Sequence, residues 1–167
     1  WYSKEAIYFG IRANADPGEV RSTLADRDKL SNDDYVMIIL DTYNDQRTAY
    51  AFGVNPLGQQ TDGTITDNVP DRKAAMPFSI DKNPDYVFDS KGRIIDTGYI
   101  IEVKIPFKSL RYSSNEIQNW GFNVLRSVQH SRHLLSLTEA KLGEASFLAQ
   151  NSQLVNIKNI NSKRLFD

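Results

Sequence analysis

The stretch "DYVMIILDTYNDQRTAYAFGVN", residues 34–55, contains two strand-like runs around a short polar connection. The first run, 34–41, is almost continuously apolar, and the second, 48–55, alternates large and small side chains. Asn44 and Asp45 fall between the runs, and both residue types favour turns because their side chains bond nearby backbone groups. Two runs separated by so few residues predict an antiparallel hairpin.

The alternation of side chains gives this predicted hairpin two different faces. One face carries the larger apolar residues and is expected to face the core: Val36, Ile38, Leu40, Tyr50, Phe52 and Val54. The other face includes several small residues: Tyr35, Met37, Ile39, Ala49, Ala51, Gly53 and Asn55. Small residues on a strand leave room for a close approach, either by a ligand or by another layer of protein.

Further period-2 patterns extend the prediction beyond the hairpin. Segments 6–14, 98–107 and 120–128 each place apolar residues on alternate positions, and turn-rich stretches separate them. Helical patterns are short and confined to 18–28 and 138–150. Many strands with little helix predict an all-β protein, a β-sandwich of two antiparallel sheets with one or two short helices.

The composition excludes several classes of function. Lys plus Arg number 20 and Asp plus Glu number 21, so the net charge of −1 gives no reason to expect nucleic acid as a partner. No run approaches the roughly 18 apolar residues of a membrane helix, so we expect no membrane insertion. Cysteine is absent, which excludes disulfides, thiolate nucleophiles and Cys-ligated zinc. The start at Trp1 indicates a module excised from a longer protein.

The sequence predicts a module without catalytic activity. It has no G-x-S-x-G motif, and its two histidines, His130 and His133, fall in a predicted turn without a third metal ligand. Glycoside hydrolysis needs two carboxylates across a cleft, and only Glu102 is placed on a strand face. The other acids fall almost entirely in predicted turns, where Asp is favoured for its backbone bonds.

Three polar side chains interrupt the non-core faces of the predicted strands: Asn55, Glu102 and Asn123. If their strands are neighbours, these groups converge on a floor made of Met37, Gly53 and Leu125, which is suitable for a ligand. The alternative is a structural network in which they bond one another, or Arg126 and Lys104.

Calcium is the metal that this sequence can accommodate, because it takes several oxygen ligands from loops. The candidate ligands are Asp41 with Asp45, or Asp62 with Asp67. No complete D-x-D-x-D-G loop is present.

Four ordered motifs resemble one known family: "RD" (27–28), "DDYVMIILDTYNDQRTAYAFGVNPLGQQTDG" (33–63), "GYIIEVKIPFKSLRY" (98–112) and "WGFNVLR" (120–126). Together they resemble the family 9 carbohydrate-binding-module-like domain. The branch concerned stands at the N-terminal side of large bacterial proteins with an uncharacterised β-rich C-terminal domain.

The resemblance implies a jelly-roll-like fold, often with structural calcium, in an extracytoplasmic protein of sugar-degrading bacteria. It covers residues 1–155, so that 156–167 would begin the connection to a following domain. In members that grip a sugar, two Trp residues clamp the ring and polar side chains on the concave strands bond its hydroxyls.

This sequence departs from the family pattern at the clamp. Ser31 stands where the first clamp Trp is expected, and Gly53 stands at the position of an Arg. The second clamp Trp is missing from "EASFLAQ", residues 144–150. The sequence therefore supports two hypotheses: a module that binds an oligosaccharide or polysaccharide on its concave face, and a docking module that packs on a neighbouring domain.

Overall fold

In a computed structural model of the chain, residues 34–55 form the expected hairpin. Strand β2 (Tyr35–Asp41) pairs antiparallel with β3 (Thr48–Val54), and Val36 lies opposite Val54. A turn that begins at Asn55 follows β3, where the N–H of Gly58 donates to the Asn55 carbonyl at 2.9 Å.

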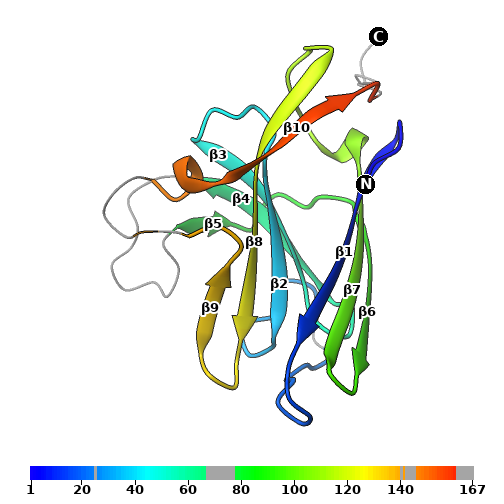
Figure 1. Ribbon diagram of the computed structural model, residues 1–167, viewed down its shortest axis with the longest axis vertical. Helices are drawn as coiled ribbons and strands as arrows, with labels where there is room; N and C mark the ends of the chain where they lie inside the picture. Colours follow the sequence, from blue (N-terminus) through cyan, green and yellow to red (C-terminus); the bar gives the residue numbers. More distant parts are fainter. Residues whose placement is uncertain (25, 67–77, 140, 142–145, 161–167) are drawn as a thin grey trace.

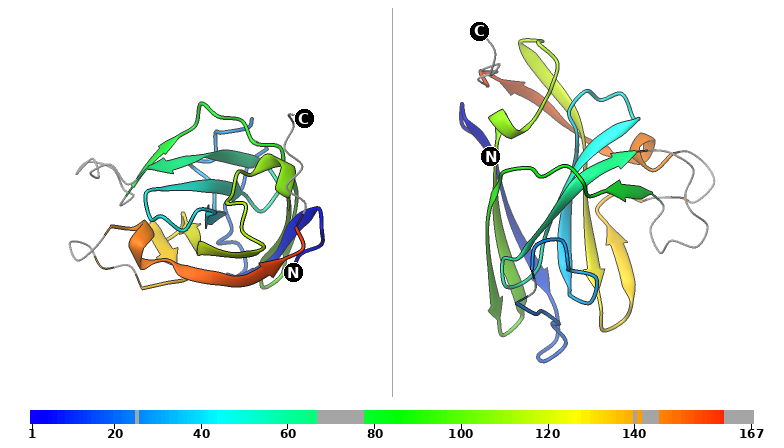
Figure 2. Two further views of the ribbon diagram at one scale, coloured as in Figure 1. Left: turned by 90° about the horizontal axis from the view of Figure 1, so that it is seen from above. Right: turned by 180° about the vertical axis from the view of Figure 1, so that it is seen from behind.

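The structure describes residues 1–24, 26–66, 78–139, 141 and 146–160, and its strands form two antiparallel sheets (Figure 1). The other strands are β1 (Ala6–Asn14), β4 (Gln60–Thr66), β5 (Ser79–Asp81), β6 (Asp89–Ile95), β7 (Gly98–Pro106), β8 (Ile117–Val128), β9 (His133–Ser136) and β10 (Ser152–Lys158). The small sheet has the order β1-β7-β6, and the large sheet has the order β10-β8-β2-β3-β4-β5, with β9 beside β8. Figure 2 shows the small sheet on one side of the molecule and β2, β8 and β9 on the other. The prediction of an all-β sandwich is confirmed.

Helical structure is limited to two three-residue 3₁₀ helices in the described part of the chain, η1 (Phe107–Ser109) and η2 (Leu148–Gln150). The helical turns expected in 18–28 do not form among the described residues of this segment, 18–24 and 26–28. Backbone groups of this segment bond other segments instead: the Arg21 carbonyl accepts from the N–H of Asp34, and the Thr23 carbonyl accepts from the side chain of Asn55. Within the described residues, no helix has the length and apolar character needed to span a membrane.

The space between the sheets is filled by the core that the alternation predicted. Apolar side chains of β1 and β7 meet those of β2, β3 and β8 there. Trp120 is fully buried at one end of this core, with its ring 6.0 Å from that of Phe107 in a T-shaped arrangement. Each such large side chain contributes on the order of 2 kcal/mol when it is removed from water.

A second apolar cluster covers the opposite face of the large sheet. Residues of β2, β3 and β8 on this face pack against side chains from connecting segments: Leu30, Phe78, Phe147 and Leu148. All seven residues of β2 are consequently buried. This double burial explains why residues 34–41 are almost continuously apolar, since a strand covered on both faces needs no polar alternation.

The beginning of the chain is attached to both sheets. Tyr2 forms a β-bridge with Ile7, and its hydroxyl accepts a hydrogen bond of 3.1 Å from the N–H of Lys158 in β10. The N-terminal residues and the end of β10 therefore lie at the same end of the sandwich (Figure 1). Strand β10 continues beyond residue 155, while the division into 1–155 and 156–167 stays a prediction.

The turn that starts at Asn55 rests directly on β6. A Cβ atom added to Gly92 would lie 2.4 Å from the Pro56 carbonyl oxygen and 2.5 Å from the Gly58 nitrogen. Both neighbours are backbone atoms, so only glycine allows β6 to approach this turn so closely.

Candidate functional site

Asn55 is fully buried, and both ends of its amide are bonded within the protein. Its Nδ2 donates to the Thr23 carbonyl at 2.9 Å and to Asp33 Oδ2 at 2.8 Å. Its Oδ1 accepts from the N–H groups of Leu57 and Gln59 at 3.0 and 2.8 Å. Asn55 thus joins residues 23–33 to the turn after β3.

Asn123 is also fully buried and bonded to its neighbours. Its Nδ2 donates to Thr138 Oγ1 at 2.8 Å and to Asn151 Oδ1 at 3.2 Å, while its Oδ1 accepts from the Ser136 hydroxyl at 3.1 Å. These contacts attach the segments after β8 to the outer face of the large sheet. Both amides are therefore bonded within the protein, but not to the partners considered from the sequence: in the described residues neither bonds the other, Arg126 or Lys104, and each has its own set of partners.

The expected floor of the site, Met37, Gly53 and Leu125, lies beneath the second apolar cluster. The space beside Gly53 is occupied by Thr61 of β4, whose Cγ2 would be 2.4 Å from an added Cβ. The neighbouring strand therefore fills the space beside Gly53, and side chains of the connecting segments cover the rest of this face. A ligand at these residues stays a prediction, and it would require displacement of the covering side chains.

Glu102 does not join the two amides, which corrects the expected arrangement. It lies in β7, the central strand of the small sheet, whereas Asn55 follows β3 and Asn123 lies in β8 of the large sheet. The alternation of β7 turns Glu102 away from the core, as expected, and the side chain is exposed. Its cross-strand neighbours are Gly10 and Lys91.

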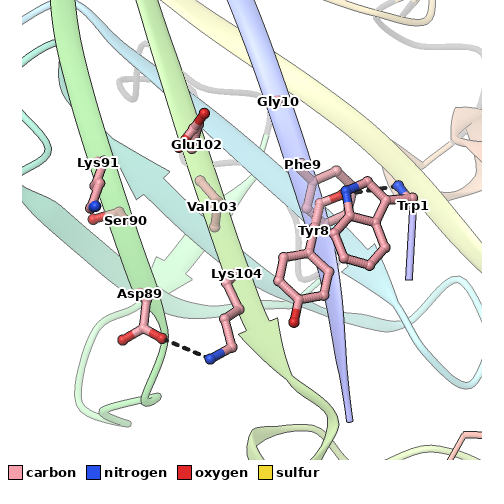
Figure 3. A pocket seen from close by; sticks show the side chains of 10 residues that line it. All are labelled: Trp1, Tyr8, Phe9, Gly10, Asp89, Ser90, Lys91, Glu102, Val103 and Lys104. Carbon is pink, nitrogen blue, oxygen red and sulfur yellow. Dashed lines mark hydrogen bonds and ion pairs between the residues drawn. The ribbon is translucent and has the colours of Figure 1, made fainter. Parts of the chain in front are cut away.

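An open groove of about 410 Å³ runs over this exposed face of the small sheet (Figure 3). Its lining includes residues from all three strands and the N-terminal residue: Trp1, Tyr8, Gly10, Asp89, Lys91, Glu102 and Lys104. Register explains the gathering, because Asp89, Lys104 and Tyr8 are direct neighbours across the sheet.

Trp1 and Tyr8 form a stacked aromatic pair at one side of the groove (Figure 3). Their ring centroids are 4.1 Å apart and their planes differ by 7°. Backbone bonds hold them opposite each other, with Tyr8 N–H donating to the Trp1 carbonyl at 2.9 Å and Trp1 N donating back at 3.2 Å. Trp1 is 79% exposed, so the pair presents a flat apolar surface to solvent.

The polar side of the groove carries balanced charge. Lys104 and Asp89 form an ion pair of 3.4 Å, and Lys91 lies beside Glu102 in the register of β6 and β7. Gly10 lies in the edge strand β1, directly opposite Glu102, and a Cβ added there would meet no atom within 4 Å. The groove is therefore open down to the backbone of β1 beside Glu102.

The predicted calcium ligands separate into two places. Asp41 and Asp45 belong to the connection between β2 and β3, where Asp41 accepts backbone N–H groups of Asp45 and Gln46 at 3.3 and 2.8 Å. Asp45 in turn accepts the N–H of Arg47 at 2.9 Å. Burial raises the pKa of Asp41, although these N–H groups oppose the shift. Both carboxylates stabilise the turn of the hairpin.

Asp62 instead lies with Asp28 and Asp85, and one carboxylate oxygen from each lies within 4.8 Å of the others. This cluster is able to hold a metal ion, but Arg27 already bonds one oxygen of Asp62, and the N–H of Tyr86 donates to the other at 2.6 Å. Burial raises the pKa of Asp62 against these two contacts. A cation would have to move the Arg27 guanidinium aside. Asp67, the partner expected for Asp62, lies outside the described residues.

The sequence did not single out the groove, because four separate segments build it. The outward position of Glu102 and Lys104 on β7 was the one signal that the alternation provided.

One solved structure shares the fold. It is described as a "putative carbohydrate-binding protein" from Bacteroides uniformis ATCC 8492, and the superposition has a TM-score of 0.51 at 14% sequence identity. The match covers 90% of this chain and 70% of that one. No protein-family model matches the chain, and no curated protein does. At this identity the likeness concerns the fold.

Proposed function

We propose that this chain is a non-catalytic, extracytoplasmic saccharide-binding module and that the groove on the β1-β7-β6 sheet is its binding site. The observation that carries the proposal is the exposed, stacked pair Trp1–Tyr8 beside a groove with polar side chains on its other side. The description of the Bacteroides uniformis protein supports the same class of ligand.

The chemistry of a sugar matches the two sides of this groove. The C–H face of a pyranose is flat and apolar, and it can stack on the open face of the Trp1 ring, as aromatic surfaces accept flat apolar partners. The ring hydroxyls then point to the polar side, where Glu102 accepts and Lys91 donates hydrogen bonds. The open space above Gly10 leaves room for a sugar ring beside Glu102.

Trp1 itself provides a reporter for the test. The chain has two Trp residues, and Trp120 is fully buried, so a soluble quencher such as acrylamide should reach Trp1 alone. We expect an oligosaccharide that stacks on Trp1 to reduce quenching and to shift the emission of this residue to shorter wavelength. Titration of neutral gluco-, xylo-, manno- and galacto-oligosaccharides, followed by calorimetry, measures the affinity.

Three variants locate the site. Trp1→Ala should weaken binding roughly three- to tenfold, since an aromatic contact contributes on the order of 1 kcal/mol. Glu102→Gln removes a charged acceptor and should weaken binding about fivefold or more. Gly10→Leu fills the open space beside Glu102 and should abolish binding, whereas Glu139→Gln, on the exposed segment after β9, serves as the matched control.

Unchanged quenching and no heat with any oligosaccharide would refute the proposal and favour a docking module. If binding survives in Gly10→Leu but disappears in a folded Asn55→Ala variant, the binding site lies on the outer face of the large sheet, as expected from the sequence.

A further inference from the structure

Two adjoining cavities, of about 160 and 360 Å³, lie at the end of the sandwich where β3 begins and η1 follows β7. They share Tyr50 and Tyr86, whose rings meet edge to face with centroids 4.9 Å apart. Tyr43 and Thr48 line the smaller cavity, and Lys108, Ser109 and Arg111 line the larger one. None of these residues lines the groove on the small sheet.

The charge of these cavities is one-sided. In the part of the chain that the structure describes, no carboxylate lines either cavity, and neither Lys108 nor Arg111 forms an ion pair. The groove on the small sheet differs, because its two lysines are matched by Asp89 and Glu102. The two cavities that share Tyr50 and Tyr86 are called the tyrosine end below. An anion is favoured there, because two cations lack a counter-charge.

The backbone of Arg111 is fixed at the wall of the larger cavity. Its N–H donates to the Tyr50 hydroxyl at 2.9 Å, and its carbonyl accepts from the Thr42 hydroxyl. The Arg111 charge acts on Tyr50, because it opposes the rise in Tyr50 pKa that burial produces. Arg111 lines this cavity, and within the described residues its guanidinium forms no hydrogen bond or ion pair with another part of the protein.

Tyr50 adds a hydrogen-bond donor to this site. Its oxygen already accepts from the N–H of Arg111, so its own proton remains for a partner in the cavity. Burial raises the pKa of Tyr50 above the ordinary 10.0, which keeps the phenol protonated at neutral pH. Tyr43, 54% exposed, supplies an open aromatic ring beside it.

We propose that this tyrosine end is a second binding site, specific for an acidic sugar residue. The carboxylate or sulfate of the sugar pairs with Arg111 and Lys108 and accepts from the Tyr50 hydroxyl, and the sugar ring packs on Tyr43. Arg111 is suited to this role because its planar guanidinium can bond both oxygens of a carboxylate. The site goes beyond the proposed function, because it occupies another face and selects a charged ligand.

The test uses the trimer of galacturonic acid, the matched neutral galactose trimer and inorganic sulfate in calorimetric titrations at low and at physiological salt. The acidic trimer should bind at least tenfold more tightly than the neutral trimer, and the difference should shrink as salt screens the charges. Arg111→Gln and Lys108→Gln should each weaken the acidic trimer about tenfold. Neither substitution removes a described contact, so both variants should fold.

Two control variants separate this site from the groove. Lys4→Gln removes an exposed cation elsewhere and should leave the binding of the acidic trimer unchanged. Gly10→Leu should also leave it unchanged, while it abolishes the binding of neutral sugars in the groove. Acidic binding lost in Gly10→Leu but kept in Arg111→Gln would overturn the second site and leave the groove proposal intact.

Equal affinity for acidic and neutral trimers would overturn the charge selectivity, whatever the location. Inorganic sulfate that binds as tightly as the acidic trimer would overturn recognition of the sugar ring. If no neutral oligosaccharide binds while the acidic trimer still binds and depends on Arg111, the groove proposal is refuted and the second site is upheld.

Discussion

At the scale of single residues, Asn55 connects three parts of the chain through one amide. It has four partners at 2.8 to 3.0 Å, and one of them is the buried carboxylate of Asp33. Asn55→Ala leaves that carboxylate with the Thr23 hydroxyl alone among these side-chain partners, and it removes the bonds of the Thr23 carbonyl and of the Leu57 and Gln59 N–H groups. Since each unsatisfied buried group costs about 1–3 kcal/mol, we expect a loss of roughly 3–5 kcal/mol in unfolding free energy, measured by urea denaturation.

Asn83→Ala, at an exposed asparagine, is the matched control and should change stability by less than about 0.5 kcal/mol. Asn55→Asp should not rescue, because it places a second carboxylate against Asp33. An Asn55→Ala protein as stable as the unchanged chain would contradict this structural role.

The hydroxyl of Tyr112 is the opposite case, since it is buried and lacks a hydrogen-bond partner in the described structure. Its ring packs near Phe107 and Trp120, so the apolar contacts do not need the oxygen. Tyr112→Phe should therefore raise the unfolding free energy by up to about 1 kcal/mol. Tyr50→Phe, which loses the bond from Arg111, should lower it by about 1 kcal/mol in the same denaturation experiment. Equal changes in unfolding free energy for Tyr112→Phe and Tyr50→Phe would contradict the view that only the Tyr50 hydroxyl is hydrogen-bonded.

At the scale of elements, the approach of β6 to the turn after β3 depends on Gly92. A Cβ there would lie within 2.5 Å of backbone atoms of Pro56 and Gly58, which cannot rotate away. Gly92→Ala should cost on the order of 2–4 kcal/mol, because the turn and the strand must separate. Gly10→Ala in β1 should instead be neutral or stabilising by up to about 1 kcal/mol, since its Cβ meets no neighbour and glycine is unfavourable in strands. Similar midpoints in urea for both alanine variants would refute the steric argument.

Among the strands that the sequence predicted, β2 is buried throughout and β7 has alternating burial. In β7, Tyr99, Ile101, Val103 and Ile105 face the core while Glu102 and Lys104 face solvent. The sequence of this strand therefore shows the alternation of apolar and polar residues that predicts a strand. The segments that became β4 and β10 gave no such signal. In β4, buried Thr61 bonds Asp28 and buried Asp62 bonds Arg27. Because these buried residues are polar, the sequence shows no alternation of apolar residues there. In β10 the register shifts between Leu154 and Ile157, which breaks the alternation.

The candidate groove lay beyond sequence reasoning for a different reason. Its residues come from the N-terminal segment and three strands, so its composition depends on sheet order. Parity placed Glu102 outward correctly, but parity cannot assign a strand to a sheet. The side-chain alternation correctly placed Asn55 and Asn123 off the core face. It could not show that residues such as Phe147 cover that face, because Phe147 lies in a short segment without a regular hydrophobic pattern.

At the scale of the whole molecule, buried tyrosines make stability sensitive to alkali. Burial raises the pKa of Tyr35, Tyr50, Tyr99 and Tyr112 above their ordinary 10.0. Between the unfolded and the folded pKa, the folded state holds more protons, so the unfolding free energy falls as pH rises. The contribution of these groups is complete below about pH 10 and is lost above it.

We therefore expect cooperative unfolding above pH 10, with the absorbance of tyrosinate near 295 nm rising together with the loss of the β-sheet circular dichroism signal. Tyr112→Phe removes one titrating group and should move the transition to higher pH. Tyrosinate formation that is complete while the circular dichroism signal stays unchanged would contradict the burial of these phenols.

The attachment of Trp1 and Tyr2 has a mechanical consequence. Two residues hold the start of the chain, Trp1 through one backbone pair with Tyr8 and Tyr2 through a bridge to Ile7 and a contact with β10. A force that pulls the N-terminal end outward breaks these bonds one after another. The hydrogen bonds between the strands of the sandwich instead bear the force together. A weak force would then separate Trp1 from Tyr8 while the sandwich stays folded, so the proposed saccharide site would lose its aromatic surface before the fold is lost.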